Sequence, residues 1–394
     1  MRATSDYTPG RYNARMLRRR ELLFLPLAGI TLSGAEPAFE PIFDGQSLAG
    51  WHIENGPDSA FYVKDGAIVV HPGSNFPAWL RSEREYENFE FQGEVFIEGW
   101  ANSGIFVHAP KHGRPTGCGM KVNIFQKADA VPLAESMGAI FPLVAPSKVN
   151  VRNKGEWNQF RIRVNWPEFK LWMNGELVQN LKLDEHPELR HRLRRGYLGL
   201  ESLSYPVRFR KLEVKPLPST DTQTTLYAAP GDLAQWRTGE PEWMEKSKWE
   251  TLGSTLRGEG LGYLATKDQF ADYDLEMYVR PSRHSNGGVY FRCPGGIKSD
   301  HYEIQVHDVE GAVYPTGSLY GIRRARWWPL EPETWFLLQI HLQGDHCVVR
   351  VDGETVVDYR GLKNLAAGPI ALQAHQTGKW IEYKEIRIRR LNHP

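Results

Sequence analysis

Residues 36–394 contain one pattern twice, and this duplication limits the folds that the chain can adopt. Segments of the first copy recur in the second at offsets of 184, then 178, then 174 residues. The matching segments are 86–89 with 270–273, 102–104 with 286–288, 157–164 with 335–342, 174–176 with 352–354, and 207–214 with 381–388. Offsets that are fixed within a block and shrink between blocks indicate loop deletions between retained strands. The pattern predicts two similar domains, residues 36–216 and 226–394, joined by a Pro- and Thr-rich linker at 217–225.

Within each copy the dominant side-chain period is two, which is typical of β-strands. Phe89–Ile97 and Gln159–Val164 alternate in this way, and Cys347–Val351 matches a buried strand. Asn174-Gly175 and Asp352-Gly353 favour tight hairpin turns, because both central residues of such a turn need a positive φ. About twelve short strands per copy predict an all-β protein of two tandem two-sheet jelly-roll sandwiches. Pro187–Arg195 is the best helix candidate.

The charge balance argues against general binding to nucleic acid or to an anionic membrane surface. The 394 residues carry 48 Lys and Arg against 47 Asp and Glu, a net charge of +1. Binding of that kind depends on concentrated positive charge. Three cysteines allow at most one disulfide bond, so no disulfide framework holds the fold.

The N-terminal 35 residues resemble a bacterial export signal. Arg18–Arg20 precede an apolar run, Leu22–Leu32, and the small residues Ser33–Ala35 follow it. The pair Arg19-Arg20 also resembles the twin-arginine signal for export of folded proteins. The run is too short to span a bilayer and no later segment approaches that length. The sequence therefore predicts a periplasmic or extracellular protein, whose natural start is Met1 or Met16.

Polar positions that differ between the copies indicate where function can lie. The segment Tyr302–Asp308 predicts a strand with Glu303, Gln305 and His307 on one face and Tyr302, Ile304 and Val306 in the core. The first copy has Lys121 and Asn123 at the positions of Glu303 and Gln305. The polar set predicted for the second copy comprises Asn286, Arg292, Glu303, Gln305, His307, Tyr320, Gln373 and His375.

These motifs resemble the 3-keto-disaccharide hydrolase domain family. The family's opening motif is matched by Phe43–Trp51, and its Asn-Ser-Gly segment by 102–108 and 286–292. The Tyr-Glu-x-Gln motif is matched by Tyr302–Gln305, and the late Gln-x-His motif by 368–375. The resemblance implies concanavalin-like jelly rolls and, for some members, cleavage of glycosides oxidised at C3 of the sugar. The first copy lacks the Arg, Glu and His of these motifs, which predicts that it is degenerate and the second copy active.

The implied chemistry assigns candidate roles to the polar set. A ketone at C3 acidifies the C2 proton, so the oxygen on C1 can leave by elimination before water adds. This route needs a base, an acid and donors for the enolate oxygen. We expect catalysis from Glu303, His375 and His307, with Glu303 or His375 as the base. The residues expected to bind the substrate are Asn286, Arg292, Gln305, Tyr320 and Gln373. Glu303, His307 and His375 could instead hold a divalent metal ion.

The sequence is also compatible with two other functions. A retaining glycosidase on a jelly roll needs two carboxyl groups about 5–5.5 Å apart, and the residue four positions after Glu303 is His307, not an acid. A non-catalytic, lectin-like protein would bind sugars by stacking them on tryptophans, of which the chain has 13. The basic and aromatic segment Arg323–Trp328 is expected at the rim of a sugar cleft and not at a nucleic-acid surface.

Overall fold

A computed structural model describes most of the chain after the N-terminal segment. The described residues are 38–74, 77–126, 131–228, 233–238, 246–294, 301–307, 309, 311–326 and 330–391. The predicted export signal at 1–35 lies outside them. No helix in the described ranges is long and apolar enough to cross a membrane.

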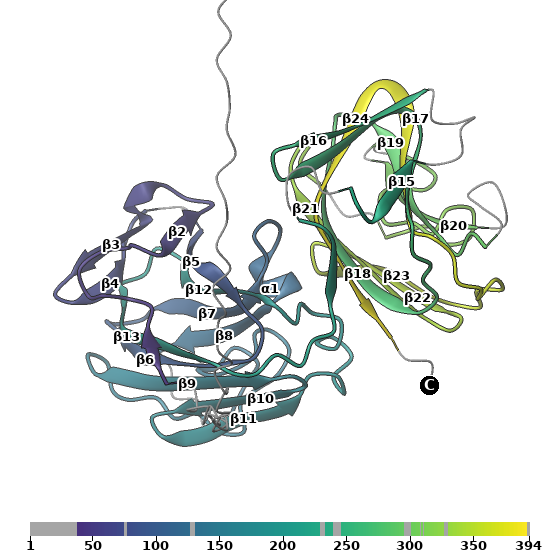
Figure 1. Ribbon diagram of the computed structural model, residues 1–394. Helices are drawn as coiled ribbons and strands as arrows, with labels where there is room; N and C mark the ends of the chain where they lie inside the picture. Colours follow the sequence, from purple (N-terminus) through teal and green to yellow (C-terminus); the bar gives the residue numbers. More distant parts are fainter. Residues whose placement is uncertain are drawn as a thin grey trace, which may run out of the picture. The chain divides into compact units, whose positions relative to one another are not determined.

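The first half of the described chain is a sandwich of two antiparallel sheets (Figure 1). One sheet has the order β11-β10-β9-β6-β13-β4-β3, with β1 on β13, and the other has the order β2-β5-β12-β7-β8. The strands are β1 (Glu40–Pro41), β2 (Trp51–Glu54), β3 (Phe61–Lys64), β4 (Ala67–Val70), β5 (Ala78–Tyr86), β6 (Phe89–Ile97), β7 (Asn102–Ala109), β8 (Met120–Phe125), β9 (Trp157–Asn165), β10 (Glu168–Met173), β11 (Glu176–Lys182), β12 (Gly196–Ser202) and β13 (Val207–Pro216). Alternate side chains of both sheets fill one apolar core between them.

The second half repeats this architecture, but its strands form one continuous 11-stranded sheet because its last strand runs through both layers. Its strands are β14 (Thr224–Tyr227), β15 (Trp236–Thr238), β16 (Ser247–Leu252), β17 (Thr255–Thr266), β18 (Tyr273–Pro281), β19 (Asn286–Phe291), β20 (Tyr302–His307), β21 (Phe336–Gln343), β22 (His346–Val351), β23 (Glu354–Arg360) and β24 (Ala371–Arg390). The first part of β24 pairs with β19, and the second part pairs with β18. In the first half two separate strands, β12 and β13, divide this role between the two sheets. The prediction of two tandem all-β jelly rolls is confirmed.

Several local predictions can be compared with the structure. Asn174-Gly175 and Asp352-Gly353 have positive φ at both residues and join hairpin strands, as predicted. The three cysteines are buried and free. The helix expected at Pro187–Arg195 is wrong, since the segment forms consecutive turns before β12. The linker expected at 217–225 overlaps β14, which begins at Thr224.

The residue after β19 is the main departure from the expected site. Strand alternation would place Arg292 on the face of Asn286, Gly288 and Tyr290, but Arg292 lies just beyond the strand end with φ 53°. This left-handed backbone turns the side chain into the interior, where it is 0% exposed. His108, at the matching position near the end of β7 in the first jelly roll, has φ 52° and is also fully buried.

The Arg292 guanidinium satisfies buried acceptors. It donates to the carbonyl oxygens of Gly344 and Ala271 at 2.7 and 3.2 Å, and it pairs with Asp272 at 3.1 Å. Five donors in a fixed fork suit such a set of acceptors. The predicted role of Arg292 in substrate binding therefore does not fit its position, because every one of these contacts is internal.

Replacing Arg292 tests its structural role. Arg292→Met removes the cation paired with the buried Asp272 carboxylate and a donor to several buried carbonyls, so we expect a loss of about 3–5 kcal/mol in the free energy of unfolding. Urea denaturation measures this loss, and Arg283→Met, at an exposed position, is the matched control. A variant at Arg292 with normal stability but weakened sugar binding would contradict the assignment.

Candidate functional site

The site is built on β20, whose alternation separates core residues from polar ones. Ile304 and Val306 are fully buried members of the core of the second jelly roll. Glu303 and Gln305 point to the opposite face and are nevertheless only 7% and 4% exposed. Neighbouring side chains on that face must therefore cover them.

The register of the neighbouring strands gathers most of the predicted residues on this face. Residues directly opposite one another in a ladder project to the same side. Glu303 lies opposite Tyr290 on β19, Gln305 opposite Gly288, and His307 opposite Asn286. Gly288 in turn lies opposite Gln373 on β24. Ile304 forms an isolated β-bridge with Leu319, which places Tyr320 beside Glu303. The Tyr320 amide donates to the Glu303 carbonyl at 2.9 Å. All the predicted site residues except Arg292 therefore share one face, which we call the β20 face.

The Glu303 carboxyl group lies in an environment that disfavours its charge. Burial raises its pKa to about 7, although a hydrogen bond with the Tyr290 hydroxyl acts in the opposite direction. The absence of a side chain at Gly288 makes room for it, since a Cβ there would lie 2.4 Å from Glu303 Oε1. Among the described residues no cation forms an ion pair with Glu303. A carboxyl group of this kind can exchange a proton near neutral pH.

Two tyrosines and one amide surround this carboxyl group. Gln373 Nε2 donates to the Tyr290 hydroxyl at 2.9 Å and to the Tyr263 hydroxyl at 3.2 Å. The Tyr290 hydroxyl also hydrogen-bonds with the Glu303 carboxyl group and with Tyr263, so these four side chains form one connected cluster. Burial raises the pKa of Tyr290, so its hydroxyl stays protonated at neutral pH.

Three residues of this face were not predicted from the sequence. Tyr290 and Tyr263 lie directly in the hydrogen-bonded cluster, and the ring of His301 lies 4.7 Å from that of Tyr290. His301 could have been predicted from the sequence, because it lies two residues before Glu303 and so continues the alternation of Glu303 and Gln305. Tyr290 could have been found from its position two residues after Gly288 on β19.

The two predicted histidines lie at the other end of the face. His307 and Asn286 form the row beyond Gln305 and Gly288, and His375 follows Ala374, the partner of Gly287. In this register His375 lies two strands away from β20 and four residues further along the strand direction than Glu303. The Cα atoms of the two residues are therefore roughly 16 Å apart. Glu303 and His375 therefore belong to different parts of the face and do not act on the same atom.

An amide pair lies between the two ends. Gln305 Nε2 donates to Asn286 Oδ1 at 2.7 Å, and in the described part of the chain Gln305 Oε1 has no hydrogen-bond partner. Gln305 is thus held by its amide nitrogen while its carbonyl oxygen can accept from a ligand hydroxyl. Sugars supply such donors.

The predicted metal site does not form. Within the described residues, no group of three or more His, Cys, Asp or Glu side chains is placed to hold a metal ion. Glu303, His307 and His375 are too widely spaced along the β20 face to converge on one ion. The metal alternative for these three residues is therefore corrected, and no step of the chemistry below uses it.

The first jelly roll holds an ion pair where the second holds Glu303. Lys121 Nζ lies 2.5 Å from Glu201 Oε2, with the Lys121 side chain buried and that of Glu201 partly buried. The ammonium group also lies 4.8 Å from the centroid of the Phe141 ring. Lys121 corresponds to Glu303, Glu201 to Gln373 and Phe141 to Tyr320. The charges in this jelly roll neutralise each other, so it offers no comparable base.

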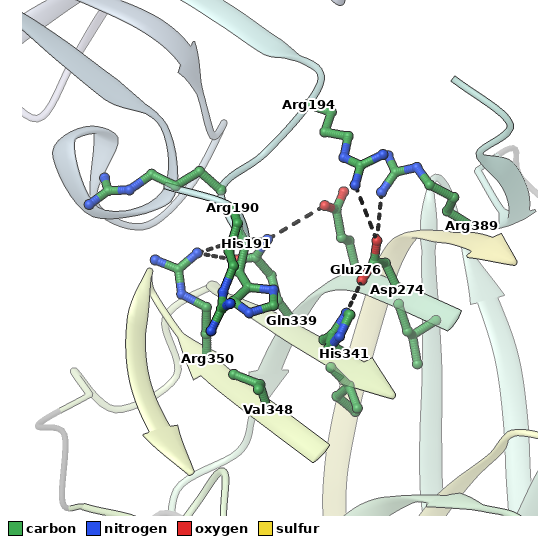
Figure 2. Close-up of a pocket in the computed structure, with 13 residues that line it drawn as sticks. Arg190, His191, Arg194, Asp274, Glu276, Gln339, His341, Val348, Arg350 and Arg389 are labelled. Carbon is green, nitrogen blue, oxygen red and sulfur yellow. Dashed lines mark hydrogen bonds and ion pairs between the residues drawn. The ribbon is translucent and has the colours of Figure 1, made fainter. Parts of the chain in front are cut away.

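A separate polar cavity, lined by residues of both jelly rolls, is not the site. His191 approaches β21, where Gln339 Nε2 donates to its carbonyl oxygen at 3.2 Å (Figure 2). On the same wall Asp274 accepts from His341 Nδ1 at 2.7 Å and from Arg389 at 3.0 Å. The cavity has a volume of about 20 Å³, enough for about one water molecule and too small for a sugar.

Comparisons with solved structures found matches that each cover less than half of this chain. A candidate glycosyl hydrolase from Parabacteroides distasonis is 20% identical, with 46% of this chain and 94% of that chain covered and a TM-score of 0.40. The carbohydrate-binding module CBM66 from Bacillus subtilis is 15% identical, with 42% and 95% covered and a TM-score of 0.33. A Bacillus subtilis protein with a galectin-like fold is 11% identical, with 45% and 98% covered and a TM-score of 0.35. A comparison with curated proteins found no match.

The family comparison is more extensive. The model of the 3-keto-alpha-glucoside-1,2-lyase-like domain matches residues 38–215 and again residues 229–389. These two segments cover well over half of the chain and coincide with the two jelly rolls. The chain therefore belongs to the family of 3-keto-alpha-glucoside-1,2-lyase-like domains, with two copies of the domain in tandem.

Proposed function

We propose that the second jelly roll is a carbohydrate-active enzyme that cleaves glycosides carrying a ketone at C3 of the sugar. The observation that carries this proposal is the buried Glu303 carboxyl group, whose pKa is raised to about 7 with no cation paired to it among the described residues. Family membership supports the substrate class. The rows of amides and tyrosines on the β20 face are suited to sugar hydroxyl groups.

In the proposed first step the Glu303 carboxylate removes the proton from C2 of the sugar. The electron pair of the C2–H bond forms the enolate with the C3 ketone. When the enolate collapses, a C1–C2 double bond forms, the C1–O bond breaks and its electron pair leaves with the aglycone oxygen, which takes up a proton. Water then adds to the unsaturated sugar at C1 and the proton returns at C2, so cleavage is a net hydrolysis.

The enolate needs hydrogen-bond donors in place of the predicted Arg292. We propose that the Tyr290 and Tyr263 hydroxyl groups, which accept from Gln373 in the Glu303 cluster, turn toward the substrate and donate to the enolate oxygen. Donors fixed in advance stabilise developing negative charge more effectively inside a poorly hydrated site than in water. His375 and His307, further along the face, are proposed to contact the oxidised sugar on the side away from its leaving group.

The β20 face favours elimination over ordinary acid–base hydrolysis of a glycoside. A retaining glycosidase needs a second carboxyl group about 5–5.5 Å from the first. At the positions of β19, β20 and Ala371–His375 that share the face, Glu303 is the only acid. For the first jelly roll we propose a non-catalytic, sugar-binding or structural role, because Lys121 and Glu201 neutralise each other.

Export of the protein is part of the same proposal. Residues 16–35 have the basic, apolar and small-residue order of an export signal. A protein placed outside the cytoplasm would meet its glycosides in the periplasm or the medium.

Glu303→Gln tests the proposed base directly. Gln has nearly the same shape but cannot accept the C2 proton, so we expect kcat toward a phenyl 3-keto-α-glucoside to fall about 10²–10⁴-fold. The measurement is release of phenol under saturating substrate. Glu331→Gln, an exposed acid of the same jelly roll, should keep the wild-type rate.

Circular dichroism must show that Glu303→Gln is folded, so that lost turnover is not lost structure. A folded Glu303→Gln variant with wild-type turnover would eliminate Glu303 as the base.

The pH dependence follows from the raised pKa of Glu303. Only the ionised carboxylate can act as a base, so kcat/KM should rise with pH and level off above about pH 7. Folding responds in the opposite sense. Between the ordinary glutamate pKa, near 4.5, and about 7, the folded protein keeps a proton that the unfolded chain has released. This stabilising contribution is present at low pH and is lost as the pH rises through 7.

Urea denaturation from pH 5 to 8 measures the stability difference between Glu303→Gln and the wild type. The variant should gain stability relative to the wild type as the pH rises. A constant difference across this range would show that Glu303 has an ordinary pKa.

A further inference from the structure

The turn that carries Tyr320 also carries a cluster of arginines. Leu319 bridges Ile304 on one side and Arg323 on the other, so the turn 319–323 extends the sheet beyond the edge of β20. The Arg323 amide donates to the Leu319 carbonyl at 2.8 Å. Arg323 thus lies two strand spacings from β20, roughly 10 Å, in the row of Ile304 and Leu319 and at the exposed edge of the sheet. Arg324 and Arg326 follow in the same segment, and all three arginines are exposed.

The first jelly roll has the same turn without the charge. Val122 bridges Ile140, which bridges Val144, in the arrangement of Ile304, Leu319 and Arg323. The Ser147 amide donates to the Val178 carbonyl just as the Arg326 amide donates to that of Val356. These two backbone patterns align the turns with an offset of 179 residues. Arg323, Arg324 and Arg326 therefore replace Val144, Ala145 and Ser147.

This replacement is not needed for the turn itself, because the uncharged sequence forms the same bridges. Arg323 and Arg324 occur only in the jelly roll that has Glu303, whereas the pair of Arg326 with Glu354 has a counterpart in the pair of Lys148 with Glu176 in the first. An arginine run is often no more than a solvated surface. Here the matched turn of the first jelly roll forms without arginines, so the arginines of the second jelly roll are better explained by a ligand than by the needs of the fold.

The arginines line an open hollow that adjoins the β20 face at Tyr320, whose ring lies 5.1 Å from that of Tyr314 in the hollow. It has a volume of about 800 Å³ and lies between this turn and β23, with Tyr314 and Ile322 adding apolar surface. Asp358, the acid in the described part of its lining, hydrogen-bonds with His346 Nε2 at 2.7 Å. Arg326 pairs with Glu354 at 2.9 Å, whereas no ion pair to Arg323 or Arg324 occurs within the described part of the chain. The hollow therefore has positive charge available for a ligand.

We propose that the substrate is an anionic glycoside, whose leaving group carries a carboxylate, sulfate or phosphate that Arg323 and Arg324 bind. This inference rests on the proposed function and adds the substrate class to it. The guanidinium group matches such anions with two parallel hydrogen bonds. With the sugar ring over Glu303, a leaving group directed past Tyr320 reaches the turn.

The test compares two substrates that differ only in charge, phenyl and 4-carboxyphenyl 3-keto-α-glucoside. The variant Arg323→Val/Arg324→Ala gives the second jelly roll the residues of the first at these two positions. We expect its KM for the carboxyphenyl substrate to rise about 10-fold, and its KM for the phenyl substrate to change less than 2-fold. Arg84→Ser, an exposed arginine of the first jelly roll, is the control and should change neither value. Equal changes for both substrates, or no change, would overturn the proposal.

A binding measurement separates this proposal from the proposed catalysis. Unoxidised 4-carboxyphenyl α-glucoside has no C3 ketone and cannot react by elimination, so calorimetry reports its binding alone. The wild type should bind it more tightly than phenyl α-glucoside, and the double variant should lose this preference. If neither 3-keto substrate is cleaved, the catalytic proposal fails while this preference still supports the anion site. Absence of the preference in the wild type would refute the anion site whatever the turnover.

Discussion

The alternation of β20 is the constraint on which the site depends. Ile304 and Val306 are locked into the core of the second jelly roll, so the intervening residues must project from the other side of the sheet. A register shift of one residue would bury Glu303 and Gln305 among apolar side chains and expose the core. The free energy that holds the sandwich together therefore also fixes where the carboxyl and amide groups lie. Tyr290 and Gln373 are placed by the same ladders.

The duplication provides an internal comparison for each functional residue. Both jelly rolls bury a charged group at the centre of the matching face, but the first pairs Lys121 with Glu201, whereas the second has Glu303 beside Gln373. In the first jelly roll the two charges of the pair neutralise each other. A buried carboxyl group without a cation has a pKa displaced toward neutrality, which is useful for catalysis and costs stability when it ionises. The difference between the two copies is thus one of chemistry on a shared fold.

Much of the fold could be predicted from the sequence because strands and hairpins are local patterns. The Asn174-Gly175 and Asp352-Gly353 turns and the two faces of β20 followed from such patterns. The position of Arg292 did not, because it depends on one left-handed residue after the strand end, which interrupts the alternation. The separation of Glu303 from His375 also needed the ladder register, since their motifs say nothing about how many strands lie between them. Tyr263 was missed because it reaches the site through Gln373, on a strand with no recognised motif.

The central claim is that Glu303 removes a proton from C2 during cleavage. Cleavage of a 3-keto-glycoside in deuterium oxide, followed by mass spectrometry of the sugar at the earliest times, tests it directly. Elimination and hydration should place one solvent deuterium at C2 in every turnover, above the exchange seen without enzyme. A cleaved sugar that keeps its original C2 hydrogen would contradict the account and indicate direct displacement at C1.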